Sequence, residues 1–325
     1  MNRRLWLSAL SLTLVAPLVR SASAVSIYQV TDLGTLGGTA SVARAINDRG
    51  QVVGESTINS GENHAFIWEN GRMRDLGLFP GDLFAAASDI NNRGQVVGAG
   101  AADFSPHALL WENGRVIDLG GTFSQAFAIN NRGQIVGVTS GGAALWQNGV
   151  LHNLASLSGG GSEAFDINDK GVIVGYSTTA TGESHAVMWT DGGIVDLGTL
   201  PGDDFSQALA INSQGQIVGT SSNISQGVER AFIWENGAMR ELGSLPTLPF
   251  SRAFSINELS QAAGVSILAG VTRATLFQKG SATQLPGLTG EALTFAYAIN
   301  NLGQLVGASD FSAVLWTRTG EISEP

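Results

Sequence analysis

The side chains best suited to chemistry in this sequence are histidines and carboxylates that recur together. A histidine or arginine stands four residues before a recurring tryptophan, and an acid stands seven residues after it, as in His64, Trp68 and Asp75. Histidine and aspartate can work together as acid–base groups or as metal ligands. The pairs of this kind are His64 with Asp75, His107 with Asp118, His185 with Asp196, and Arg230 with Glu241.

The two members of each pair change together along the chain. Where the acid is Glu241 the partner is Arg230, and the neutral Asn153 corresponds to Gly142. If the intervening turn is centred on Asn70-Gly71, His64 and Asp75 are diagonal neighbours on one face of a hairpin. Copies spread over several units would not converge on one atom. We therefore interpret the pairs as structural ties between neighbouring strands, with a metal ring or catalytic dyad as the alternative.

The pairs belong to a unit that is repeated seven times. Each copy has an Ile-Asn step, a short polar turn, and a strand like Gln51-Val52-Val53-Gly54. The asparagines follow one another at intervals of 38 to 45 residues, which is the length of a four-stranded propeller blade. The recurring asparagines are Asn47, Asn91, Asn130, Asn168, Asn212, Asn257 and Asn300.

The ends of the chain indicate that the units form a ring. Residues 27–34 resemble the fourth strand of a unit, whereas the seventh unit runs out of chain soon after Trp316. Pairing residues 27–34 with the strand that ends at Trp316 would remove the exposed edge. We therefore predict an all-β, seven-bladed β-propeller of four-stranded blades, closed by the N-terminal strand, with residues 25–325 as one domain. The recurring aromatic residue is assigned to the core between blades.

The loops predict where a binding site would lie. In every unit the two tight turns fall at one end of the blade, and the longer, variable connections fall at the other, which we call the loop-rich face. Carboxylates there could hold a calcium ion or contact sugar hydroxyls, and solvated loop acids are the alternative. The candidate residues at this face and at the mouth of the central channel are Asp82, Gln125, Glu163, Asp203, Asp204, Gln207, Arg252 and Glu291.

Composition indicates an exported protein. Residues 1–24 have the features of a signal peptide, with Arg3 and Arg4 before an apolar run and a cleavage pattern at Ala22-Ser23-Ala24. Without them the formal charge falls from −10 to −13, which disfavours nucleic acid and anionic lipid as partners. Since the chain has no cysteine, disulfides and thiolate chemistry are excluded. We expect a secreted or periplasmic monomer whose mature chain does not insert into a membrane.

One motif set carries a resemblance to a known family. His64-Ala65-Phe66, within the segment HAFIWENG, follows AINDRGQVVG and precedes Asp75-Leu76-Gly77. This combination resembles the HAF-repeat family of bacterial exported proteins. The resemblance implies an extracellular or cell-envelope repeat protein, but it supplies no reaction, ligand or catalytic residue.

Three functions are compatible with this sequence. The leading hypothesis is a binding module that takes an extracellular ligand, a protein or a glycan, at the loop-rich face. The alternatives are an enzyme that processes extracellular carbohydrate or peptide with carboxylates at the channel mouth, and a structural protein of the cell envelope. The nucleophile elbow, zinc helix, phosphate loop and calcium loop motifs are absent, which favours binding over catalysis.

Overall fold

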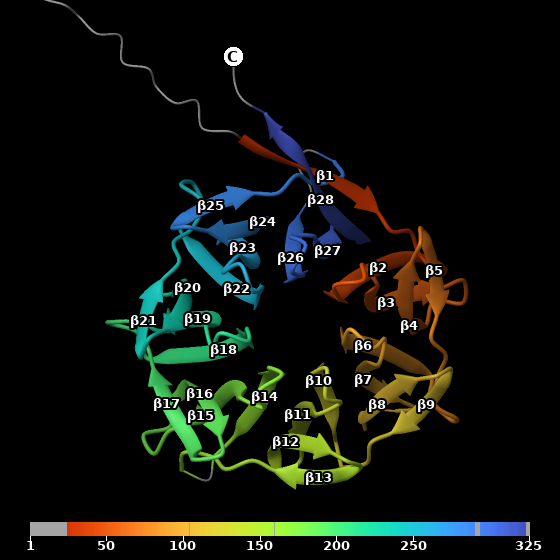
Figure 1. Cartoon of the computed structure of the whole chain (residues 1–325), viewed down its shortest axis with the longest axis horizontal. Coiled ribbons are helices and arrows are strands. Elements are labelled where there is room, and N and C mark those ends of the chain that lie inside the picture. Colours follow the sequence, from red (N-terminus) through yellow and green to blue (C-terminus); the bar gives the residue numbers. More distant parts are fainter. Residues whose placement is uncertain (1–24, 104, 159, 290–292, 323–325) are drawn as a thin grey trace, which may run out of the picture.

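The chain forms a ring of seven β-sheets around a central opening (Figure 1). The computed structural model describes residues 25–103, 105–158, 160–289 and 293–322. The predicted signal peptide, residues 1–24, lies outside the described residues, as do Glu291 and the last three residues. Every sheet has four antiparallel strands, so the predicted seven-bladed propeller is confirmed.

The first four blades follow one another along the chain, each built from the channel outward. Blade 1 contains β2 (Gly37–Ile46), β3 (Val52–Ile58), β4 (Asn63–Glu69) and β5 (Arg72–Asp75). Blade 2 contains β6 (Phe84–Ile90), β7 (Val96–Ala101), β8 (His107–Glu112) and β9 (Arg115–Asp118). Blade 3 contains β10 (Gln125–Ile129), β11 (Ile135–Thr139), β12 (Gly142–Gln147) and β13 (Val150–Asn153). Blade 4 contains β14 (Ser162–Ile167), β15 (Ile173–Thr178), β16 (Ser184–Thr190) and β17 (Gly193–Gly198).

The last three blades complete the circle. Blade 5 contains β18 (Phe205–Ile211), β19 (Ile217–Asn223), β20 (Val228–Glu235) and β21 (Ala238–Glu241). Blade 6 contains β22 (Phe250–Ile256), β23 (Ala262–Leu268), β24 (Val271–Gln278) and β25 (Ser281–Gln284). Blade 7 contains β26 (Thr294–Ile299), β27 (Leu305–Ser309), β28 (Ser312–Ile322) and, from the other end of the chain, β1 (Val25–Asp32).

The two ends of the described chain close the ring. Strand β1 pairs antiparallel with β28, and Val30 lies opposite Trp316. The predicted pairing of the N-terminal strand with the last blade is therefore confirmed. Closure in this way places the N-terminal strand in the last blade and covers the outer edge of β28.

The hydrophobic core lies between blades rather than within them. Seven clusters of buried side chains each combine residues from two neighbouring blades, including the closing pair of blades 7 and 1. Most of the recurring aromatic residues belong to these clusters, as predicted, and Trp316 is fully buried. Trp68 and Trp234 are only half-buried. The blades therefore depend on one another for burial of their apolar faces.

Each inner strand carries a bulge that decides which side chains face the channel. The register between β10 and β11 shifts between Ala126 and Ala128, which leaves Phe127 without an opposite residue. Gly137 lies against this irregular stretch, and a Cβ there would collide with the carbonyl oxygen of Gln125. The same crowding occurs at the equivalent glycine of every blade, which explains why the second strand always contains Gly.

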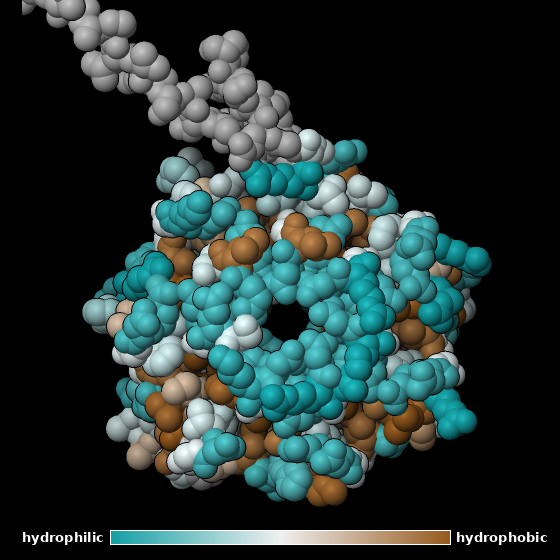
Figure 2. Space-filling view, viewed as in Figure 1, coloured by the Kyte–Doolittle hydropathy of each residue, from teal (hydrophilic) through white to brown (hydrophobic). Residues whose placement is uncertain are grey.

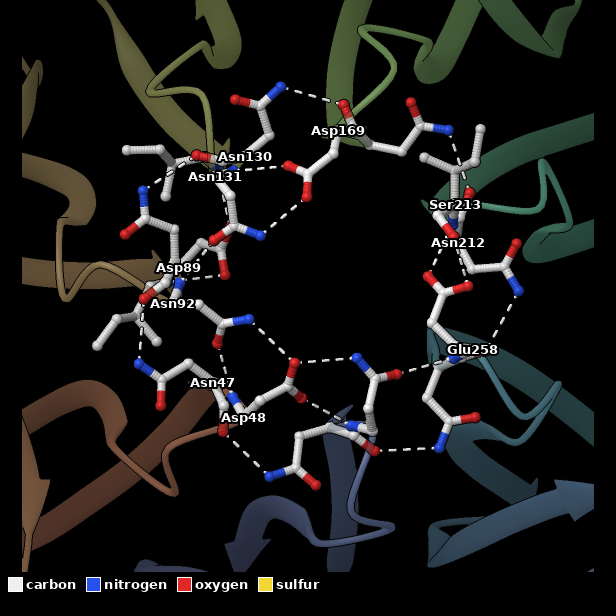
Figure 3. Close-up of a pocket in the computed structure, with 18 of the residues that line it drawn as sticks. Asn47, Asp48, Asp89, Asn92, Asn130, Asn131, Asp169, Asn212, Ser213 and Glu258 are labelled. Atoms are coloured by element: carbon white, nitrogen blue, oxygen red, sulfur yellow. Dashed lines mark hydrogen bonds between the residues drawn. The ribbon is translucent and has the colours of Figure 1, made fainter.

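The recurring asparagines form a closed ring of hydrogen bonds at the end of the channel where the tight turns lie, which we call the turn-rich face (Figure 3). Each side-chain Nδ2 donates to the backbone carbonyl of the corresponding asparagine in the next blade, at 3.0–3.1 Å. Asn300 closes the circle by donating to Asn47. Each Oδ1 also accepts from the backbone N–H groups two and four residues later, for example those of Arg49 and Gln51. The repeated Asn is thus a structural residue that joins all seven blades.

Candidate functional site

Four of the eight predicted ligand-binding residues lie at equivalent positions on neighbouring inner strands. Gln125, Glu163, Gln207 and Arg252 each stand five residues before the ring asparagine, on β10, β14, β18 and β22. The first three are half-buried, and Arg252 is exposed. Because the inner strands surround the channel in Figure 1, these residues form a polar tier on one side of it, near the loop-rich face.

An aromatic tier lies two residues further along the same strands. Phe127 contacts Phe165 of the next blade with ring centroids 5.6 Å apart, and Phe254 contacts Tyr297 in the same way, also at 5.6 Å. The bulge at each of these positions keeps the rings half-buried instead of fully packed between blades. The wall of the channel therefore offers aromatic surface next to polar groups.

The charged residues of the channel wall have partners on neighbouring strands. Arg252 Nε lies 2.6 Å from Glu229 Oε1. The Tyr176 hydroxyl donates to Glu163 Oε1 at 3.2 Å. Burial raises the pKa of the Glu163 carboxyl, and the hydrogen bond from Tyr176 opposes this rise. The pKa of Tyr176 is raised too, by burial and then by the nearby Glu163 charge.

The predicted loop acids Asp82 and Asp203 do not join this tier. The Asp82 side chain is 4% exposed and lies 2.9 Å from His107 Nε2. The Asp203 side chain is 1% exposed, lies 2.6 Å from Arg230 Nη2 and accepts a hydrogen bond from Ser221. Both acids come from the connection that precedes their blade, and each is held by a basic side chain of that blade, Asp82 by His107 and Asp203 by Arg230. They anchor that connection.

The other two predicted loop residues also lie apart from the polar tier. Asp204 Oδ1 accepts a hydrogen bond from the backbone N–H of Ile224, in the loop between β19 and β20. Glu291 lies outside the described residues.

The recurring polar pairs lie between the third and fourth strands of their blades. His64 Nδ1 lies 2.7 Å from Asp75 Oδ2, and His185 Nδ1 lies 2.9 Å from Asp196 Oδ2. Both aspartates are about 40% exposed. These two pairs stand in different blades, so they do not share a common centre.

In the other two pairs the loop acid is the closer partner. His107 Nδ1 lies 3.2 Å from Asp118 Oδ2 but makes no hydrogen bond there, while its Nε2 contacts Asp82. Arg230 Nη1 lies 3.7 Å from Glu241, compared with 2.6 Å between its Nη2 and Asp203. From the sequence, only Asp118 and Glu241 were paired with His107 and Arg230, because the loop acids stand 25 and 27 residues away in sequence.

A hollow of about 800 Å³ lies in the channel wall beside the polar tier. Its floor is formed by Ala86 and Ser88 of β6 and Ala99 of β7, and its walls include Phe84 and Gln125. At the positions of Ala86 and Ser88 the other blades mostly carry larger side chains, such as Gln125 and Phe127 in blade 3. Blade 2 thus has an apolar depression where its neighbours have filled wall. The hollow was not predicted from the sequence, although the small side chains of Ala86 and Ser88 indicate a gap in the channel wall.

Two further carboxylates in the channel wall were also missed. Asp89 and Asp166 stand two residues before the ring asparagine, where the other blades have Ala or Ser. Asp89 Oδ2 accepts from the Ile129 N–H, and Asp166 Oδ2 accepts from the Ile211 N–H, each in the following blade. Burial raises the pKa of Asp89 to about 6 and that of Asp166 to about 7, and the Asp89 charge adds to the rise at Asp166.

The channel narrows to a polar cavity of about 230 Å³ at the asparagine ring. Figure 2 shows hydrophilic residues around the central opening on the face in view. The carboxylates here are bound by neighbouring amides: Asp48 accepts from Asn92 and from Asn301. Among the described residues, no group of three or more His, Asp or Glu side chains is placed to hold a metal ion. In that same part of the chain no helix has the length and apolarity needed to cross a membrane.

Comparison with solved structures shows propellers of similar shape and unrelated sequence. Streptogramin B lyase matches with a TM-score of 0.61 and 11% identity, over 90% of this chain and 98% of the lyase. The extracellular domain of a one-component system from B. thetaiotaomicron matches with a TM-score of 0.58 and 8% identity, over 88% of this chain and 39% of that protein. The propeller domain of the Trilobed protease from Pyrococcus furiosus, which has an open velcro topology, matches with a TM-score of 0.55 and 10% identity, over 88% and 95% of the two chains.

Comparison of sequences found no match. No protein-family model and no curated protein matches this chain. The structural similarity, at 8–11% identity, shows the fold alone.

Proposed function

We propose that this protein is an exported binding module of the HAF-repeat type that takes a small ligand at the loop-rich end of its channel. The observation that carries this proposal is the hollow of about 800 Å³ in blade 2. Its volume falls within the range of small-molecule sites, and it is lined mainly by apolar side chains with few polar groups. Such a hollow in one blade of an otherwise regular ring gives the channel a single preferred place for a ligand.

The surroundings of the hollow define the chemistry of that ligand. Leu83 and Phe84 at its rim are 64% and 43% exposed, so they offer apolar contact. Gln125 belongs both to the hollow and to the polar tier that continues to Glu163. A ligand with one bulky apolar group and hydrogen-bonding groups beside it would match both parts. A peptide with an aromatic or branched aliphatic side chain has this chemistry.

Filling the hollow tests the proposal. The Ala86→Phe variant should place a ring in the depression and lower affinity at least tenfold for peptides selected on the wild-type protein. Binding would be followed by calorimetry with a library of short peptides and a glycan panel as probes. The control Thr181→Phe places a ring in the exposed loop between β15 and β16 of blade 4, outside the hollow, and should keep the wild-type affinity. Unchanged peptide binding by a folded Ala86→Phe protein would overturn the proposal.

The enzymatic alternative rests on one residue. Glu163 is a half-buried carboxyl with a raised pKa at the channel wall, which suits a general acid for cleavage of a glycan or peptide. The Glu163→Gln variant keeps the shape of the side chain and removes the proton. Any hydrolysis of a bound ligand should then fall by at least about a hundredfold, while full turnover in this variant would exclude Glu163 as the acid.

A further inference from the structure

We infer that the cleft between blades 1 and 2 on the turn-rich face binds a phosphate or sulfate group. The cleft encloses about 250 Å³ and is lined by Arg49, Arg74, Arg93 and Arg115. Its base includes the ring of Trp111. This site stands at the opposite end of the blades from the proposed ligand site, and it was not anticipated from the sequence.

The arginines of this cleft exceed the acids that could neutralise them. The two carboxylates in the cleft, Glu69 and Glu112, each accept a hydrogen bond from a glutamine, at 2.8 Å and 2.6 Å. Arg74 lies 3.8 Å from Glu69, a long ion pair. The side chains of the other three arginines make no ion pair or hydrogen bond with any described residue. Four arginines and two carboxylates line the cleft, so it carries an excess of positive charge in a protein whose net charge is −10. The end of the Arg93 side chain reaches toward blade 3, where its Nη2 lies beside Gly133.

The repeat shows that the cations at this position differ from blade to blade. The position of Arg49 and Arg93, in the first turn of each blade, holds Arg132 in blade 3 and Lys170 in blade 4, but Gln214 in blade 5 and Leu259 in blade 6. The corresponding cleft between blades 5 and 6 holds one arginine, Arg240, and that side chain is paired with Glu235 at 2.8 Å. The tight turns have the same geometry in each case, so structure alone does not require arginine at these positions.

Phosphate and sulfate fit the chemistry of the cleft best. Guanidinium groups bind such oxyanions through two parallel N–H donors. Arg49 and Arg93 are exposed, so binding should weaken as the salt concentration rises. A long polyanion would approach the acidic remainder of the protein and be repelled by it. The ligand is therefore a small molecule, or the end of a chain, that carries one phosphate or sulfate group.

Titration of the mature chain with inorganic phosphate and sulfate at constant ionic strength tests this inference. We expect saturable binding by calorimetry or by NMR shifts of Trp111. The Arg49→Gln/Arg93→Gln variant should weaken it at least tenfold. The control Lys170→Gln/Arg240→Gln removes the same charge elsewhere on the turn-rich face and should change affinity less than twofold. Arg49→Lys/Arg93→Lys, which keeps the charge without the paired donors, should be intermediate.

Three results would overturn the inference. They are no saturable binding of either anion by the wild-type protein, equal weakening in the test and control variants, and full affinity in Arg49→Gln/Arg93→Gln. All four arginines are on the surface of tight turns or short strands, so the variants should fold, which thermal melting would verify. If a sulfated oligosaccharide binds more tightly than free sulfate and is lost with the same variants, the group comes from a glycan end. If only a phosphorylated sugar does so, it comes from a phosphate ester.

Discussion

The two ends of the central channel follow opposite rules. At the turn-rich end every blade contributes the same asparagine to one closed network of hydrogen bonds, and Asn300 joins the last blade to Asn47 of the first. At the loop-rich end equivalent positions carry Gln125, Glu163, Arg252 or the small Ala86. The uniform end can hold the ring together because each bond is repeated around the circle. The varied end can discriminate among ligands because the blades present different side chains there.

The largest effect should come from breaking the closing blade. Trp316 is fully buried, packs between blades 6 and 7, and donates from Nε1 to the Pro286 carbonyl at 2.7 Å. The Trp316→Ala variant should lose about 3–5 kcal/mol in the free energy of unfolding, measured with a chemical denaturant. The control Phe311→Ala removes a ring that is 76% exposed and should cost less than about 0.5 kcal/mol. Similar losses in both variants would show that burial of Trp316 does not account for the stability of the closing blade.

Breaking the asparagine ring should be the next most costly change. In Asn300→Ala the hydrogen bonds to the Asn47 carbonyl and to two backbone N–H groups are lost, and buried polar atoms remain without partners. We expect a loss of roughly 2–4 kcal/mol. Asn63→Ala, at an exposed position, should have little effect in the same unfolding assay. Loss of ligand binding at the loop-rich end with unchanged stability would contradict the purely structural role of the asparagine ring.

Much of the uniform end was predictable because repetition exposes it. The seven asparagines, the glycine of each second strand and the unpaired N-terminal strand recur or stand out in the sequence, so fold, closure and the facing of His64 and Asp75 could be argued before the structure. The role of the asparagine was not predicted, since a single repeat gives no sign that its amide reaches the next blade. That contact exists only once the ring has closed.

The varied end was harder to predict for two physical reasons. The hollow in blade 2 is made by missing side chain volume at Ala86, Ser88 and Ala99, and absent atoms leave no chemical motif. Asp82 and Asp203 were placed at the channel mouth because they are acids in loops. In the structure both contact a basic side chain of their own blade, and such pairing across 25 or more residues depends on loop path rather than on spacing.

The acids in the channel wall should make the stability of the fold depend on pH. The pKa of Asp166 is raised to about 7 by burial, compared with an ordinary value of 3.8 in the unfolded chain. The folded state therefore holds a proton that the unfolded state has released between about pH 4 and pH 7. Stability should fall as the pH rises through this window, and above it the loss is complete.

Replacing the acid by its amide tests this pH dependence. Asp166→Asn cannot ionise, and its one amide oxygen can accept from the Ile211 N–H or from the Ile167 N–H, whereas the carboxyl accepts from both. Between pH 4 and pH 8 its stability relative to the wild type should rise by roughly 1–2 kcal/mol, since one pKa unit corresponds to about 1.4 kcal/mol and the side chain is only half-buried. At pH 4 the variant should be the less stable protein, because its NH2 group cannot accept the second backbone N–H. If Asp166 ionised at no cost to the folded state, thermal melts would show the same difference in melting temperature between the two proteins at every pH in this range.

The smallest effects should come from the polar pairs, which differ according to burial. Asp75 is 40% exposed, so a double-mutant cycle of His64→Ala and Asp75→Ala should give a coupling energy below about 1 kcal/mol. Asp82 is 4% exposed and lies 2.9 Å from His107 Nε2, so the cycle of His107→Ala and Asp82→Ala should give a larger value, roughly 1–3 kcal/mol. Zero coupling in the first cycle would remove the structural role of the exposed pairs. Equal coupling energies in the two cycles would mean that burial of the Asp82 carboxyl does not strengthen its interaction with His107. The connections at the loop-rich end would then be held by backbone contacts alone.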